Sequence, residues 1–341
     1  MKKSLTFLFA LMLLFCQILS GCGSQYTTPT SKSGFYFNTV ITVTIYEAIN
    51  EETLDECFAL ASKYENLFSN TIPESDISRI NAAGGAPVTV DNETIALLEE
   101  GIAYGNLSDG KFDITIGKLS DLWDISTKAL LEETDATMIP SDADIMTALA
   151  TIDYRNIKIE GNEVSLLDPD SKLDLGGIAK GYIADRMKDF LNGKGITSGF
   201  INLGGNFLAL GAKENGEAYT VGIQKPFAED GSAIASIEVT DETVVSSGTY
   251  ERYFTVDDML YHHILDTSTG YPYQNNLLGV TIITKNSVDG DALSTTCFSL
   301  GLEDGMTLIE SLPDTEAIFI TDDYELHTSS GIGTTIPFTK R

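Results

Sequence analysis

The segment Asp174-Leu175-Gly176-Gly177-Ile178-Ala179-Lys180-Gly181 follows a strand-like run and precedes an apolar pattern of helical spacing, at Ile183, Met187, Phe190 and Leu191. Two adjacent glycines are therefore expected at a helix N-terminus. Unpaired amides and the helix dipole favour an anion there, missing β-carbons let a pyrophosphate approach, and Lys180 adds a positive charge. A tight strand-to-helix turn would also need glycines, and this segment alone does not separate the two readings.

Helices and strands come in blocks on both sides of this segment. Apolar residues at helical spacing mark Leu54 to Phe68, and further helix starts follow Asp91-Asn92 and Pro140. Alternating or β-branched runs predict strands near 37–46, 156–167, 198–211, 218–224, 233–247, 252–265, 277–284 and 316–327. This order favours an α+β fold over a doubly wound sheet. We expect residues 35–341 to form a single domain of two closely packed α/β lobes.

A second segment, Asp291-Ala292-Leu293-Ser294-Thr295-Thr296, carries hard oxygen ligands. A helix over 291–301 would place Asp291 and Thr295, four residues apart, on one face. Magnesium favours carboxylate and hydroxyl oxygens and completes its shell with water and substrate phosphates. Asp291 would equally serve as an N-cap of that helix, and the spacing alone favours the cap.

The N-terminus has the features of an export signal. A basic start at Met1-Lys2-Lys3 and an apolar run from Leu5 to Leu19 precede Leu19-Ser20-Gly21-Cys22. This arrangement resembles a bacterial lipobox, which implies a signal peptide over residues 1–21 and a lipid on Cys22. Residues 22–34 are rich in Ser, Thr, Gly and Pro and are expected to be a flexible tether. The protein is thus predicted to be anchored by lipid to the cell membrane, on its extracytoplasmic side.

Charge and cysteine content exclude several classes of function. The formal net charge is -29, which repels nucleic acid, so we expect no nucleic-acid partner. A dinucleotide would also be repelled unless a cation offsets the charge locally, which favours a metal site over a basic pocket. Cys57 and Cys297 lie in apolar helical patterns and are expected to be buried thiols rather than a disulfide.

Several segments in a fixed order resemble the ApbE family of magnesium-dependent FAD:protein FMN transferases. They are Phe68-Ser69 through Asn81, Ser108 to Gly117, Asp174 to Asp185, Asn202 to Asn206, Ser247 to Arg252, Tyr261 to Gly270 and Asp291 to Gly301. Each segment is weak on its own, and their co-occurrence in this order carries the resemblance. Phe37-Asn38-Thr39 and Asp266-Thr267 depart from the family pattern, which often has Met-Gly-Thr and Asp-Pro there.

The resemblance implies a set of site residues. A carbonyl at Gly177, with Asp291 and Thr295, would hold Mg2+, and this implication overturns the preference for a cap. Asp291 would be essential to catalysis. The FAD-contacting residues would be Thr71, Gly110, Lys111, Phe112, Asp113, Asp174, Lys180 and Leu265.

The implied reaction transfers FMN from FAD to a threonine or serine hydroxyl of an acceptor protein with a flavin-binding domain. Phosphoryl transfer needs positioning and charge neutralisation, and the acceptor hydroxyl also needs a base. His263 is the candidate base, although it would equally well hydrogen-bond the pyrophosphate. His262 and His327 are expected to be structural or exposed. Two alternatives stay open at this point, a metal-dependent FAD pyrophosphatase that yields FMN and AMP, and a lipoprotein that only binds flavin.

Overall fold

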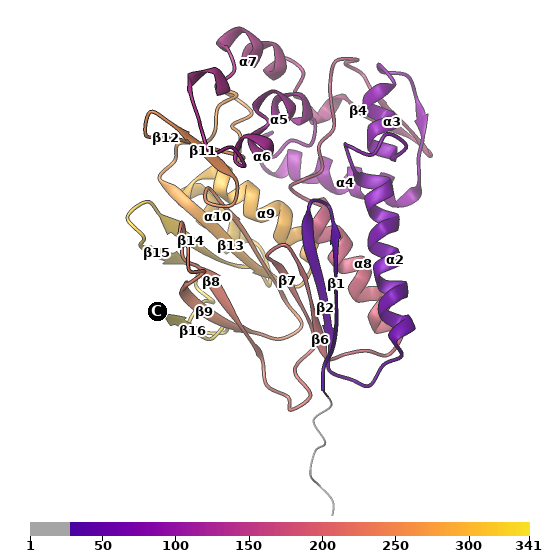
Figure 1. Cartoon of the computed structure of the whole chain (residues 1–341), viewed down its shortest axis with the longest axis vertical. Helices are drawn as coiled ribbons and strands as arrows, with labels where there is room; N and C mark the ends of the chain where they lie inside the picture. Colours follow the sequence, from indigo (N-terminus) through magenta and orange to yellow (C-terminus); the bar gives the residue numbers. More distant parts are fainter. Residues whose placement is uncertain (1–27) are drawn as a thin grey trace, which may run out of the picture.

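The computed structural model describes residues 28–341, and an eight-stranded antiparallel sheet forms its centre (Figure 1). The sheet order is β1-β2-β6-β7-β10-β13-β14-β15. The strands are β1 Thr30–Tyr36, β2 Thr39–Ile45, β6 Gly199–Leu203, β7 Asn206–Leu210, β10 Thr243–Gly248, β13 Leu277–Thr284, β14 Glu316–Thr321 and β15 Leu326–Thr328. Every pairing in it is antiparallel, which agrees with the predicted α+β class.

Helices cover one face of this sheet. They are α2 Glu51–Phe68, α8 Ala179–Gly193, α9 Ser287–Leu300 and α10 Leu302–Ser311. Helix α4 Asn92–Leu107 packs against α9. Apolar residues of α2, α8 and α9 share a core with inward residues of β2, β6 and β13. Cys57 and Cys297 are both free and buried in this core, as predicted.

The opposite face carries a smaller sheet of order β16-β9-β8, formed by β8 Tyr219–Gln224, β9 Ala233–Val239 and β16 Phe338–Lys340. Strand β14 shows why both faces can be buried. Its Ala317 and Phe319 belong to the helix-side core, whereas Ile318 and Ile320 belong to the core beneath the smaller sheet. Successive residues of a strand point to opposite faces, so a continuous apolar run covers both.

A third cluster lies at one end of the molecule, at the top of Figure 1. It joins α5 Gly117–Trp123, α6 Ile125–Lys128 and α7 Asp142–Leu149 to the hairpin of β11 Tyr253–Val256 and β12 Met259–His262. Trp123 is fully buried there, and its indole N–H donates to the Gly270 carbonyl at 2.7 Å. A small sheet of order β3-β5-β4 (Val88–Thr89, Glu163–Leu166, Ile157–Glu160) lies beside α3 Asp76–Ala82. The domain is therefore built from closely packed groups of helices and strands, in agreement with the expected α+β domain.

The boundary predicted for the tether is wrong at its C-terminal end. Residues 30–34 belong to β1, which pairs with β2 along its full length and so has its backbone groups satisfied by the sheet. The predicted signal peptide, Cys22 and the first part of the tether lie outside the described residues. Over residues 28–341, none of the helices combines the length and apolar character needed to cross a bilayer.

The departure at Phe37-Asn38 has a structural explanation. These two residues connect β1 to β2 and both have positive φ, 53° and 55°, as a two-residue hairpin turn with a primed geometry requires. Asn tolerates this conformation better than most residues, whereas Phe adopts it at a cost. The Phe37 amide donates to Glu65 of α2 at 2.7 Å, which holds the turn against the helix.

Candidate functional site

The glycine-rich segment forms the entry to α8. The helix begins at Ala179, so Gly176 and Gly177 directly precede its N-terminus, as predicted. In place of the expected strand before them, Lys172 makes only an isolated parallel bridge to Ile116. The Gly176 amide donates to Asp174 Oδ1 at 2.8 Å, so this amide serves the turn and is not directed at a ligand. Desolvation raises the pKa of Asp174, and the Gly176 hydrogen bond partly offsets the increase.

Asp291 lies within α9 and does not cap it. The helix begins at Ser287 with Asn286 as its N-cap, which places Asp291 in the second turn and makes the capping reading wrong. Asp291 is buried, and its Oδ2 accepts from the Gly181 amide of α8 at 2.9 Å. Its other oxygen, Oδ1, lies 3.9 Å from Lys180 Nζ. The carboxylate therefore links the start of α8 to the second turn of α9.

Thr295 and Gly177 lie close together across the same junction. A β-carbon built on Gly177 would stand 3.6 Å from Thr295 Oγ1 and 3.2 Å from the Phe112 ring. Ser247, at the end of β10, bonds Ser294 Oγ at 2.7 Å and Thr295 Oγ1 at 3.3 Å. The structure thus brings three segments, from α8, α9 and β10, around one group of oxygen atoms.

This donor set fits a magnesium ion. Asp291 provides one carboxylate oxygen that is free of backbone hydrogen bonds among the described residues, and Thr295 provides a hydroxyl. Gly177 lies next to Thr295, so its backbone carbonyl would be the third donor that the family resemblance implies. These are hard oxygen donors, and Mg2+ is commonly held by one or two carboxylates plus waters and substrate phosphates. Residues 28–341 hold no cluster of three or more His, Cys, Asp or Glu side chains, so a zinc-type site is not formed there.

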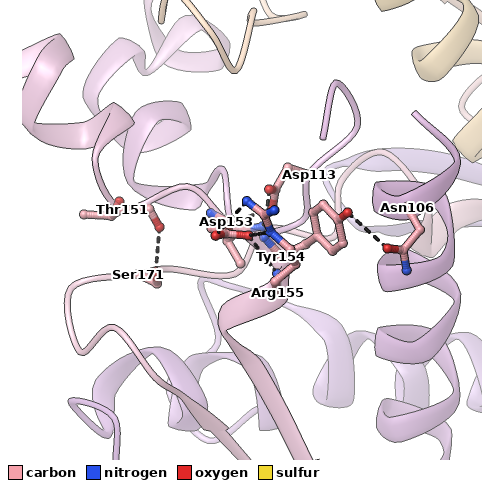
Figure 2. Close-up of polar contacts among 8 residues, drawn as sticks. Asn106, Asp113, Thr151, Asp153, Tyr154, Arg155 and Ser171 are labelled. Carbon is pink, nitrogen blue, oxygen red and sulfur yellow. Dashed lines mark hydrogen bonds and ion pairs between the residues drawn. The ribbon is translucent and has the colours of Figure 1, made fainter. Parts of the chain in front are cut away.

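The loop from Gly110 to Asp113 adjoins this junction and is held by a network of hydrogen bonds (Figure 2). Asp113 is buried, and it accepts from the Thr115 amide and hydroxyl at 2.8 and 2.6 Å and from the Tyr154 amide at 2.8 Å. The Tyr154 hydroxyl bonds Asn106 of α4 at 3.1 Å. Asp113 therefore shapes the loop, and its predicted direct contact with flavin stays a prediction.

Other members of the predicted flavin set lie in different environments. Lys111 is exposed with its Nζ 5.9 Å above the Tyr273 ring, and Thr267 Oγ1 donates to the Gly110 carbonyl at 2.8 Å. Leu265 is buried in the cluster around Trp123. Thr71 is exposed beyond α2, and its hydroxyl bonds Ser69 at 3.0 Å. Of these, Lys111 and Gly110 share the loop of Phe112, whereas Thr71 comes from a separate segment.

His263 lies beside Arg252, and the charge of Lys180 also acts on it. Its backbone amide and its Nδ1 both approach the Arg252 carbonyl, at 3.2 and 3.4 Å. This contact favours the tautomer with hydrogen on Nδ1 and leaves the Nε2 lone pair free to accept. Desolvation by the surrounding protein, with the Arg252 guanidinium next in size, lowers the pKa of His263 to about 3. The imidazole is therefore neutral at physiological pH.

Comparison with known proteins decides the family. A sequence profile described as the ApbE family matches residues 37–319. The chain belongs to the ApbE family. A FAD:protein FMN transferase of Klebsiella pneumoniae (strain 342) is 38% identical over 284 residues, covering 82% of this chain and 86% of that protein. One of Treponema pallidum (strain Nichols) is 32% identical over 342 residues, covering 94% and 92%.

Solved ApbE structures share the fold. The ApbE protein of Thermotoga maritima aligns with a TM-score of 0.79 at 29% identity, covering 89% of this chain and 97% of that chain. The flavin transferase ApbE of Vibrio cholerae aligns with a TM-score of 0.77 at 26% identity, again covering 89% and 97%. With relatives of this kind, the present ApbE protein is an enzyme of the transferase class.

Sequence reasoning missed residues that hold the site of this ApbE protein in place. Asn81 of α3 bonds Leu173 twice, donating to its carbonyl at 3.0 Å and accepting from its amide at 2.7 Å, so it fixes the chain just before Asp174. Ser247 supports Thr295 from β10. Both residues lie in segments that carry the family resemblance, and this was the only signal that pointed to them, because their contacts join distant parts of the chain.

His262 has a structural role, in agreement with expectation, and makes stability depend on pH. It is buried, and its Nε2 bonds the Tyr273 carbonyl at 2.9 Å. Burial lowers its pKa to about 4, from 6.5 when unfolded. Between these pH values only the unfolded chain binds the proton, so the free energy of unfolding falls as pH falls, by up to about 3 kcal/mol.

The His262→Gln variant tests this pH dependence. Gln keeps a donor for the Tyr273 carbonyl but does not titrate, so the difference in stability between wild type and variant should change with pH. We expect urea unfolding to show that the free energy of unfolding of wild type decreases relative to that of the variant as pH drops from 6.5 to 4. A difference that is constant over this range would contradict the buried, neutral imidazole.

Proposed function

We propose that this ApbE protein transfers FMN from FAD to a threonine or serine hydroxyl of an acceptor flavoprotein, in a magnesium-dependent reaction that releases AMP. One observation carries the proposal. The start of α8, with Gly177 and Lys180, meets the Asp291–Thr295 face of α9, so a cationic side chain and hard metal ligands share one place. The names of the relatives, FAD:protein FMN transferase, support the same reaction.

The site residues would have three roles, which are metal binding, neutralisation of the pyrophosphate charge and contact with the rest of FAD. Gly177, Asp291 and Thr295 would hold Mg2+, which neutralises charge on the phosphate oxygens when it is bound. Lys180, 3.9 Å from Asp291, adds a cation for the pyrophosphate. Arg252 would supply a second cation, since its charge acts on both His263 and Asp174 and it therefore lies near the same site. The loop of Gly110 to Asp113 with Leu265 and Thr71 would contact the remainder of FAD.

The chemical step is an in-line displacement at the FMN-side phosphorus. The acceptor hydroxyl oxygen forms a bond to that phosphorus. At the same time the bond between this phosphorus and the bridging oxygen of the pyrophosphate breaks, and AMP leaves with the bridging oxygen. The hydroxyl proton passes to His263 Nε2, whose lone pair is free. The pKa of His263 is held down in part by Arg252 and Lys180, so an anionic pyrophosphate that neutralises these cations would raise it towards the working pH.

The acceptor is expected on the outer side of the membrane. The lipobox-like sequence ending at Cys22 would anchor the enzyme there through a lipid, so an accessible acceptor would be an exported electron-transfer subunit or flavin-carrying lipoprotein. Metabolic labelling of the full-length chain with an alkyne fatty acid tests this anchor. Label that disappears in Cys22→Ala supports it, and label that persists contradicts it.

Intact-mass spectrometry of an acceptor domain tests the reaction itself. The acceptor is incubated with residues 24–341 of the enzyme, FAD and Mg2+, with parallel samples that contain chelator or an acceptor whose target threonine is alanine. We expect an FMN-sized adduct that requires both metal and threonine. Unmodified acceptor together with free FMN and AMP would instead show hydrolysis, and intact FAD would show a binding protein.

A further inference from the structure

Helices α8 and α9 cap each other. Asp185, from the second turn of α8, accepts from the Ser287 amide at 2.7 Å and the Val288 amide at 2.8 Å, at the start of α9. In return, Asp291 of α9 accepts from the Gly181 amide at 2.9 Å, in the first turn of α8. One amide in the first turn of α8 and two at the start of α9 are thus satisfied by an aspartate of the other helix.

Close contact makes this exchange possible. A β-carbon on Gly181 would lie 2.2 Å from the Ser287 carbonyl oxygen and 2.7 Å from Val288 Cα, so only glycine allows the helices to approach this closely. The Ser287 hydroxyl also donates to Asn206 of β7 at 2.8 Å. The start of α9 is therefore held from both α8 and the central sheet.

The residue at the N-cap position of α9, Asn286, does not cap the helix. Within residues 28–341 its side chain accepts no bond from the helix amides, and its side-chain NH2 instead donates to Asp289 at 2.9 Å. Asp185 takes over as a cap supplied by a neighbouring helix. Asp185 therefore helps to determine the position of α9 relative to α8, and the turn that contains Gly177 directly precedes α8.

We propose that Asp185 is a positioning residue for the metal site, because it fixes α9 against α8 so that Asp291 and Thr295 stand beside Gly177. The inference rests on the proposed magnesium-dependent function and adds to it a residue that does not touch metal or substrate. Without Asp185, the Ser287 and Val288 amides lose their acceptor. The Ser287–Asn206 and Gly181–Asp291 bonds then hold the start of α9 less firmly, so α9 can shift relative to α8. The expected consequence is weaker metal binding from ligands that are themselves intact.

Two variants and one matched control test the proposal. Asp185→Ala removes the cap from α9, and Asp185→Asn keeps one acceptor oxygen but places an NH2 group against the second amide. Asp91→Ala removes a local aspartate cap from α4, in which the Asp91 side chain accepts from the Glu93 amide at 2.9 Å, and so measures the general cost of losing a cap. Mn2+ binding to each protein is titrated by electron paramagnetic resonance in the presence of FAD, and transfer is measured against Mg2+ concentration.

We expect Asp185→Ala to weaken Mn2+ binding about 10- to 100-fold, the usual loss when a partner that orients metal ligands is removed. Asp185→Asn should fall between it and wild type, and it decides the question if the Ala protein does not fold. Transfer should recover at high Mg2+, and Asp91→Ala should lower only the melting temperature. Mn2+ affinity that changes no more than in the control would overturn the proposal. Failure of wild type itself to bind Mn2+ or transfer FMN would instead overturn the proposed function.

Discussion

Asp291→Asn is expected to lower FMN transfer at least about 10³-fold, because it removes the only carboxylate among the three proposed metal ligands. The substitution is chosen to spare the fold. The Asn side chain still has an oxygen that can accept from the Gly181 amide, the bond by which Asp291 holds α8 at 2.9 Å. A loss of transfer with an unchanged melting temperature would therefore report on the metal site and not on unfolding.

Asp289→Asn is the matched control for this prediction. Asp289 lies on the same helix, two residues earlier, and accepts from the Tyr104 hydroxyl at 2.6 Å, a bond that an Asn oxygen can also accept. We expect this variant to keep its transfer rate, measured as the initial rate of acceptor flavinylation at saturating FAD and Mg2+. An unchanged rate in Asp291→Asn would remove Asp291 from the metal site.

His263→Ala is expected to slow transfer by about 10²- to 10⁴-fold while FAD affinity stays close to that of wild type. The reason is the environment of the ring. Its Nδ1 faces the Arg252 carbonyl at 3.4 Å, which leaves Nε2 to accept a proton. Its lowered pKa keeps the ring neutral in the free enzyme, and a bound pyrophosphate that offsets the nearby cations would make the ring more basic. Single-turnover flavinylation gives the rate, and quenching of flavin fluorescence gives the affinity.

The two readouts separate the roles that the sequence left open for His263. A rate that falls while FAD still binds supports the base, whereas an equal loss of FAD affinity would show that His263 only contacts the pyrophosphate. His327→Ala serves as the control, since His327 lies exposed on β15 at the far edge of the sheet and should leave both quantities unchanged.

Much of the fold was predictable because its elements carry their own pattern. Helix α2 shows its apolar face from Leu54 to Phe68, and β13 is rich in apolar and β-branched residues. Strand β1 was not predictable, because its Ser, Thr and Gly residues resemble a tether and only pairing with β2 makes it a strand. The start of α9 was missed for a similar reason, since its cap, Asp185, comes from another helix.

The types of metal ligand in the site were predictable from the sequence, whereas the residues that hold these ligands in position were less so. The spacing of Asp291 and Thr295 indicated one helix face, but the residue facing them, Gly177, lies in a different helix entry and was assigned by family resemblance. Spacing also favoured a cap for Asp291, which the structure excludes. Residues such as Asn81 and Ser247 act through contacts across the fold, and local sequence patterns do not encode such contacts.

The most direct test of the metal site is a crystal structure of the protein with FAD and Mn2+, with data collected at the manganese absorption edge. The account predicts one anomalous peak bonded to an Asp291 carboxylate oxygen, the Thr295 hydroxyl and the Gly177 carbonyl, next to the pyrophosphate. A peak bound elsewhere, with these three groups free of metal while FAD is present, would contradict it.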